Sequence, residues 1–412
     1  MNDRSRFLIL HIGAVCCAQI LLTAWLIHMK FEPAWLAVML LVSLTGCFLH
    51  IKGILRDPDY LLKLGGIKDE RKGRIPQLDH LRVIAVCGVI LTHVIQVDIE
   101  SYRPPMLYAA NILWVLTMAC NAIYVMLSGA LLYRWREESL RVFYARRIIT
   151  IGVPLVVYYL WYTAVNYHLG RGWDWVSIKS VPHWILANEM REAPHFWLIY
   201  VILSIYVTVP LFRHLFRHVS YKDLTKALTA VFLFTVLSNV LLPYAQLAVT
   251  LPISGWLLVS FAGYWVCLEK TRRYDRFLIM IGITAGIGIC LFAALRPETE
   301  VLNAYCLNDR PLVIAFCVGL FAFVFYCRRW FSKDFVLIRC MSKYAYGMIL
   351  IHWWALHFVV RARFSISSMS FHYLGTPLSL VLILMISWVF CFIVDNLLVL
   401  PVRKLLEKIF VR

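Results

Sequence analysis

Long apolar runs alternate with short, basic connections along the whole chain. Each run is long enough to cross or nearly cross a bilayer, because a membrane-spanning helix needs roughly 20 mainly apolar residues. The runs are continuous rather than apolar at every second position, so they predict helices and exclude the strands of a membrane β-barrel. The twelve segments cover approximately residues 7–28, 34–51, 82–97, 107–132, 148–168, 196–212, 227–247, 254–269, 276–295, 311–327, 345–361 and 377–400.

The lysines and arginines gather in alternate connections. If the N-terminus is cytoplasmic, the basic connections all fall on the cytoplasmic side, whereas the connections on the other side hold few positive charges. This asymmetry predicts that both termini are cytoplasmic. The basic connections are residues 52–74, 134–147, 213–226, 270–276 and 328–343, together with the C-terminal tail 403–408.

Composition and charge agree with a multi-pass membrane protein. The chain of 412 residues is 61% hydrophobic, with a mean hydropathy of +0.74, which excludes a soluble domain of this length. A net charge of +18 would suggest nucleic-acid binding in a soluble protein. Here we attribute it to the cytoplasmic connections and expect no nucleic-acid partner. The same basic surface would attract anionic cofactors such as nucleotides.

The pattern divides the chain into three parts. Residues 1–52 form an N-terminal transmembrane hairpin, residues 53–74 a polar cytoplasmic linker, and residues 75–405 a core of ten spans. The predicted fold class is therefore an all-α polytopic membrane protein with about twelve transmembrane helices. The longest outer connection, residues 169–195, contains Trp173 and Trp175. These tryptophans either anchor an interfacial segment or offer aromatic faces on which sugar rings stack.

The third predicted span carries the most informative pair of residues, Arg82 and His93. Eleven residues turn an α-helix by three turns plus ~20°, so both side chains share one face, roughly 16 Å apart. This places Arg82 near a membrane surface and His93 near the midplane, where ionisable groups are expensive and mark function. Asp79, three residues before Arg82, can pair with it and favour the helix start.

Three further clusters are candidates for the same site. Arg146 and Arg147 stand at the cytoplasmic mouth of the fifth span, where they either anchor the helix or bind the phosphates of a nucleotide-like cofactor. Helical rise places His352 about 10 Å inside its span, on the cytoplasmic side of His93. Ser128 precedes a glycine, a pair typical of close helix packing. No spacing favours a metal site, and no P-loop or GxSxG motif occurs.

These clusters, in this order, resemble the membrane-bound acyltransferase 3 family. The resemblance covers roughly residues 75–405, and its motifs are fairly specific in combination and weak singly. The matching stretches are Leu78-Asp79-His80-Leu81-Arg82 leading to His93, Val125-Met126-Leu127-Ser128-Gly129, Arg146-Arg147 to Pro154, His195-Phe196-Trp197-Leu198-Ile199-Tyr200 to Pro210, and Tyr346-Gly347-Met348-Ile349-Leu350-Ile351-His352.

The resemblance implies O-acyl transfer, usually of acetyl, from cytoplasmic acyl-CoA to a hydroxyl of a surface glycan or lipid-linked sugar. Relatives concerned with glycans lie in the bacterial inner membrane. We expect His93 to be general base or acyl carrier, with Arg82 and Asp79 beside it. The rival hypothesis is a flippase for a lipid-linked glycan, without chemistry. The acyl chain, the acceptor and the oligomeric state remain open.

The donor-binding candidates are Arg146, Arg147, Tyr346, His352 and Ser128, and the acceptor-binding candidates are Trp197, Trp173 and Trp175.

Overall fold

The protein is helical throughout the part of the chain that the structure describes. The computed structural model describes residues 3–28, 33–57, 59–68, 73–166, 175–188, 193–241, 253, 255–296, 298–367, 370 and 374–411, and no strand occurs among them. Eight helices in this part are long and apolar enough to cross a membrane, and α11 (Gly255–Val266) and α14 (Pro311–Tyr326) are shorter apolar helices. The predicted all-α polytopic fold is confirmed.

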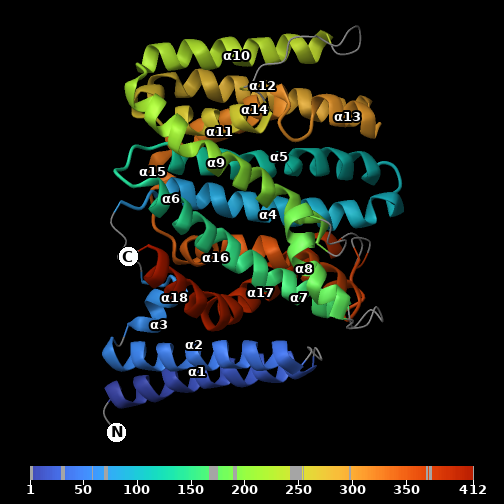
Figure 1. The fold of residues 1–412 in the computed structure, drawn as a ribbon. Coiled ribbons are helices and arrows are strands. Elements are labelled where there is room, and N and C mark those ends of the chain that lie inside the picture. Colours follow the sequence, from blue (N-terminus) through green and yellow to red (C-terminus); the bar gives the residue numbers. More distant parts are fainter. Residues whose placement is uncertain are drawn as a thin grey trace.

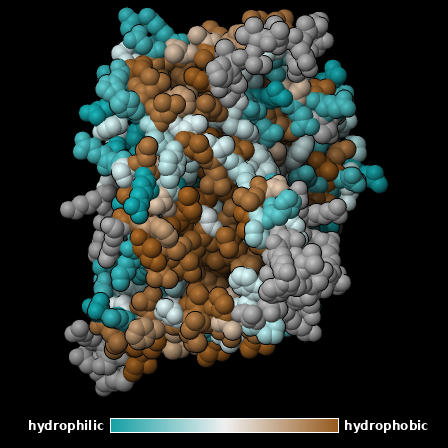
Figure 2. Space-filling view, viewed as in Figure 1, coloured by the Kyte–Doolittle hydropathy of each residue, from teal (hydrophilic) through white to brown (hydrophobic). Residues whose placement is uncertain are grey.

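The helices run roughly parallel and stack in layers (Figure 1). α1 (Asp3–His28) and α2 (Pro33–Arg56) form one edge, and α10 (Tyr221–Leu241) forms the opposite edge. Both chain termini lie at the same end of the helices. We call this end the basic face, because the arginine-rich connections lie there, and the other end the opposite face. An apolar belt lies between more hydrophilic ends in Figure 2, as expected of a membrane protein.

Three central helices position the candidate site: α4 (Pro76–Asp98), α5 (Met106–Leu132) and α16 (Val336–Trp354). α4 begins with a proline in its first turn, where the missing N–H costs nothing, and Asp79 there interacts favourably with the helix dipole. The remaining helices are α6 (Leu140–Arg147), α7 (Val153–Asn166), α8 (Trp175–Ala187), α9 (Trp197–His218), α12 (Asp275–Leu295), α13 (Thr299–Tyr305), α15 (Arg328–Phe331), α17 (Gly375–Val394) and α18 (Leu400–Phe410).

Glycines let α5 and α11 pack backbone against backbone. A Cβ added at Gly129 would lie 1.8 Å from the carbonyl oxygen of Ser260, and one added at Gly263 would lie 2.1 Å from that of Met126. Neither contact is possible for a larger residue without moving a helix. Gly129 therefore serves close helix packing, as a small residue in a membrane helix predicts.

The N-terminal hairpin packs into the core rather than beside it. Trp25 of α1 contacts Trp161, Trp354 and Phe390, with ring centroids 4.3, 5.3 and 4.6 Å apart. On α2, His50 hydrogen-bonds through Nε2 to the carbonyl oxygen of Asn396 at 2.9 Å. These contacts tie the first two helices to α7, α16 and the π-helical turn Asp395–Val399.

The predicted linker contains a short helix, α3 (Tyr60–Gly65), that binds the basic end of α16. Arg339 donates to the carbonyl oxygens of Gly66 and Ile67. Lys343 donates to the carbonyl oxygens of Lys63 and Leu64, at 2.9 and 2.5 Å. Backbone carbonyls left free at the end of α3 are thus satisfied by side chains of a helix late in the sequence.

Candidate active site

A buried polar network lies at the basic end of α4. The carboxylate of Asp79, 6% exposed, accepts from Arg82 at 2.9 Å, from Arg74 at 2.6 Å and from the hydroxyl of Ser342. Ser342, on α16, also accepts from Arg82 at 2.8 Å. Arg74 bridges onward to Asp334 at 2.6 Å. Two charge-assisted hydrogen bonds fix the direction of Arg82, one to Asp79 on its own helix and one to Ser342 on α16.

Three histidines from three separate parts of the chain meet deeper in the bundle. His93 comes from α4, His352 from α16 and His195 from the turn Pro194–Phe196 that precedes α9. The ring centroids of His93 and His352 lie 5.2 Å apart with the rings stacked, and those of His195 and His352 lie 4.7 Å apart. The His93 and His195 centroids are 6.5 Å apart. Trp353 packs against both His93 and His195.

Backbone carbonyls fix the protons on two of these rings. His195 Nε2 lies 3.1 Å from the carbonyl oxygen of Leu350, and His352 Nδ1 lies 2.7 Å from that of Ile349. A carbonyl only accepts, so each of these nitrogens carries the proton of the neutral ring. The other nitrogens, His195 Nδ1 and His352 Nε2, then present lone pairs, and neither has a hydrogen-bond partner among the described residues. Nδ1 of His93 is also buried without such a partner.

Buried polar atoms without partners are rare, because leaving one unsatisfied costs about 1–3 kcal/mol. Three of them on adjacent rings indicate a place where substrate hydroxyls can bind. Metal binding is a separate question: the described residues contain no group of three or more His, Cys, Asp or Glu side chains arranged to hold a metal ion. The expectation of no metal remains a prediction.

The histidine cluster lies nearer the opposite face than the sequence suggested. His93 precedes the end of α4, Asp98, by five residues, or about 7 Å of helical rise. The prediction that His352 lies on the cytoplasmic side of His93 is wrong, because the two rings stack. The physical reason is the length of α16, which begins at Val336, well before the predicted span, and so carries His352 further into the bundle.

Arg146 and Arg147 point to different surroundings. Arg146 is half exposed and pairs with Glu138 at 2.6 Å. The Arg147 guanidinium lies over the rings of Phe143 and Tyr206, at 5.3 and 5.8 Å from their centroids. Its Nε is buried without a hydrogen-bond partner among the described residues. Successive residues on a helix project about 100° apart, so only Arg147 faces the interior.

Several of the predicted donor-binding side chains lie around Arg147. The hydroxyl of Tyr346 donates to the carbonyl oxygen of Ile151 at 3.0 Å, in the π-helical turn Ile148–Gly152 that follows Arg147. Ser128 lies within hydrogen-bonding reach of Tyr206, on which Arg147 stacks. The structure therefore brings together Arg147, Tyr346 and Ser128.

The predicted acceptor-binding tryptophans fall in different places. Trp197, in the first turn of α9, packs against Trp256 of α11, with ring centroids 5.7 Å apart. It follows His195 by two residues and lies at the end of the bundle near the histidine cluster. Trp173 lies outside the described residues, and Trp175 begins α8, but its side chain is not described.

His195 is the residue to which the sequence assigned no role. It belongs to the motif that continues into Trp197, but nothing in its spacing links it to His93 or His352. The pattern of a histidine directly before an apolar helix was its only signal. Its place beside both rings depends on the packing of the turn Pro194–Phe196 against α16, whereas α9 itself packs on α5 and α11.

The comparisons with known proteins give one match. A family model described as an acyltransferase domain, that of the acyltransferase 3 family, matches residues 75–395. These residues hold the histidine cluster and all of the polar network except Arg74. No curated protein and no solved structure matches. The family model covers well over half of the chain, so this multi-pass membrane protein belongs to the acyltransferase 3 family.

Proposed function

We propose that the protein transfers an acyl group, most simply acetyl, from cytoplasmic acyl-CoA to a hydroxyl of a surface glycan or lipid-linked sugar. The observation that carries this proposal is the histidine cluster, where His93, His195 and His352 present buried nitrogens without partners. A sugar that binds among them would find a fixed lone pair on His195, another on His352 and an unpartnered nitrogen on His93, each able to accept from one hydroxyl. Such an arrangement suits proton removal from an alcohol.

The donor would bind from the basic face. Coenzyme A carries several phosphates, which arginine binds through paired, charge-assisted hydrogen bonds. Arg147 is the better candidate than Arg146, because its guanidinium faces inward and its Nε is unpaired. Arg82 lies deeper and is about 16 Å of helical rise from His93. The thioester would reach between them toward the histidines, past Tyr346 and Ser128.

The acceptor would approach from the opposite face. The cluster lies close to that end of α4, and Trp197 and Trp256 present neighbouring aromatic rings there. Aromatic faces suit the apolar faces of sugar rings. A donor on one side and an acceptor on the other would let the protein modify a glycan outside the cytoplasm with an acyl group made inside it. The inner membrane of a bacterium, with both termini cytoplasmic, is the location that fits this arrangement.

In direct transfer, His93 takes the hydroxyl proton while the oxygen attacks the thioester carbonyl. The C–S bond breaks, coenzyme A leaves as the thiolate, and the proton held on His93 neutralises it. In the two-step alternative, a nitrogen of His93 attacks the thioester carbonyl, the C–S bond breaks, and coenzyme A leaves as the thiolate and takes up the proton that the acylated ring releases. The hydroxyl oxygen then attacks the acyl-imidazole, the N–acyl bond breaks, and the hydroxyl proton returns to the released ring. The free nitrogens of His195 and His352 only accept, so in both routes they would bind other hydroxyls of the sugar.

The test incubates membranes that contain the protein with radiolabelled acetyl-CoA. Label in the polysaccharide or glycolipid fraction, with stoichiometric release of coenzyme A, supports acyl transfer. A label that stays on the protein and disappears after His93→Ala supports the acyl-histidine route. Movement of a lipid-linked sugar across the membrane without label transfer would instead favour the flippase.

A further inference from the structure

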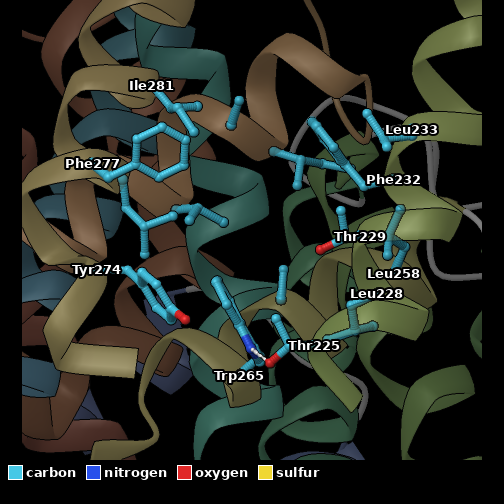
Figure 3. Close-up of a pocket in the computed structure, with 15 residues that line it drawn as sticks. Thr225, Leu228, Thr229, Phe232, Leu233, Leu258, Trp265, Tyr274, Phe277 and Ile281 are labelled. Carbon is cyan, nitrogen blue, oxygen red and sulfur yellow. Dashed lines mark hydrogen bonds between the residues drawn. The ribbon is translucent and has the colours of Figure 1, made fainter. Parts of the chain in front are cut away.

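An apolar cavity lies between α10 and the layer formed by α11, α12 and α14 (Figure 3). These helices contribute no side chain to the histidine cluster. The cavity has a volume of about 420 Å³, which is within the ~300–1,000 Å³ typical of ligand sites. Figure 3 shows Phe232 and Leu233 of α10 on one wall and Phe277 and Ile281 of α12 on the other. A cavity with this apolar lining can bind a hydrocarbon chain.

The cavity exists because α10 is fastened mainly near its two ends. Near the basic face, Trp265 donates through Nε1 to the hydroxyl of Thr225 at 2.9 Å, and Leu224 is buried. Towards the opposite face, Asn239 donates to the carbonyl oxygen of Ala304 at 2.8 Å. Between these attachments, apolar side chains of α10 face the hollow instead of packing on α12.

A positively charged rim borders the cavity at the basic face. The guanidinium of Arg273 lies between two tyrosine rings, 4.7 Å from the centroid of Tyr274, which lines the cavity, and 5.6 Å from that of Tyr221. No carboxylate within the described residues pairs with Arg273, whereas Asp275 is engaged by Arg272 at 3.3 Å.

The size of the cavity decides between possible occupants. One turn of a helix, about 10 Å wide and 5.4 Å long, already fills roughly 420 Å³. A transmembrane helix of a partner or of a second copy therefore cannot enter, whereas a single extended hydrocarbon chain can. The chain would run beside α10 from Tyr274 to Leu233, and its head group would meet Arg273.

We propose that this cavity binds an anionic glycerophospholipid from the leaflet at the basic face. One acyl chain occupies the apolar hollow, and the phosphate lies at Arg273. A cation near a membrane surface favours an anionic lipid by about 1 kcal/mol, or roughly fivefold. The site is independent of acyl transfer, because it uses none of the residues assigned to donor, acceptor or proton.

The experiment titrates the purified full chain with phosphatidylglycerol or phosphatidylcholine of identical acyl chains and counts retained lipids by native mass spectrometry. Thr229→Trp fills the cavity from an exposed position on α10, and Ala227→Trp, which faces away from the cavity, is its matched control. Arg273→Gln removes the head-group cation. Its control is Arg296→Gln, an exposed arginine at the other end of α12.

The proposal expects one tightly retained phosphatidylglycerol, bound at least fivefold better than phosphatidylcholine. Arg273→Gln should weaken phosphatidylglycerol about fivefold and leave phosphatidylcholine unchanged, whereas Thr229→Trp should weaken both lipids. Both control variants should match the wild type. Equal retention of the two lipids, or a Thr229→Trp variant that binds like the wild type, would overturn it. A dimer of this chain that retains no lipid would also overturn the proposal.

Discussion

The different surroundings of Arg146 and Arg147 allow the donor site to be tested with adjacent residues. Arg147→Gln removes a guanidinium that faces inward over Tyr206, whereas Arg146→Gln removes one that is half exposed and paired with Glu138. If Arg147 binds a phosphate of acyl-CoA, its loss removes a charge-assisted hydrogen bond worth about 1.5–3 kcal/mol. That energy corresponds to a roughly 10- to 150-fold weaker donor.

Arg146 should matter much less. An exposed ion pair contributes about 0–1 kcal/mol, so its loss should change donor affinity by no more than about fivefold. Arg147→Lys should recover part of the affinity, because it keeps the charge and loses the planar fork. The salt dependence of donor binding should also flatten in Arg147→Gln, since one attractive charge is gone.

The assay measures the dissociation constant of labelled acetyl-CoA on the purified protein, at low and high salt, for wild type and the three variants. Thermal unfolding of each variant is the control for folding, because Arg147 also packs on Phe143. Equal losses for Arg146→Gln and Arg147→Gln would refute the assignment. So would unchanged affinity in both, and the coenzyme would then have to bind elsewhere.

Three further outcomes are expected. His93→Ala should lower acyl transfer by about 10²-fold or more while the protein still inserts into the membrane, and activity within threefold of wild type would remove His93 from the mechanism. Reporter fusions after residue 185 and at the C-terminus should report opposite sides of the membrane, with the C-terminus cytoplasmic; the same side for both would mean a miscounted span. Gly129→Ala should lower the unfolding temperature, because a Cβ there would lie 1.8 Å from the Ser260 carbonyl oxygen. The control, Ala130→Gly, is one residue later on α5 and should cost only about 1 kcal/mol of helix propensity.

The helices could be predicted from the sequence because each membrane span is a single continuous stretch of apolar residues. The run predicted over residues 107–132 is α5, Met106–Leu132, and that over 311–327 is α14, Pro311–Tyr326. Burial in lipid demands apolar side chains all round a helix, so the signal is local and strong. The start of α16 at Val336 was missed, because Arg339 and Lys343 interrupt the apolar pattern there.

The site could be predicted only where its residues share one helix. Arg82 and His93 both face α16, as their spacing on α4 indicates. His195 and Ser342 reach the site through tertiary packing, so no local pattern connects them with α4. The adjacent arginines 146 and 147 look equivalent in the sequence, and only the position of their helix against Glu138 and Tyr206 separates them.

The attachment of α3 to α16 has a consequence for how the protein is made. Arg339 and its acceptor Gly66 are 273 residues apart in the chain. At ~5–20 residues per second, the ribosome delivers α16 roughly 15–55 s after α3. Helices α1, α2 and α3 have therefore already been made, with the carbonyl oxygens of Gly66 and Ile67 still without Arg339, when α16 emerges. Helix α16 then inserts beside a segment that the N-terminal part of the chain has already placed, and a chain begun at residue 75 would have to insert α16 without that segment.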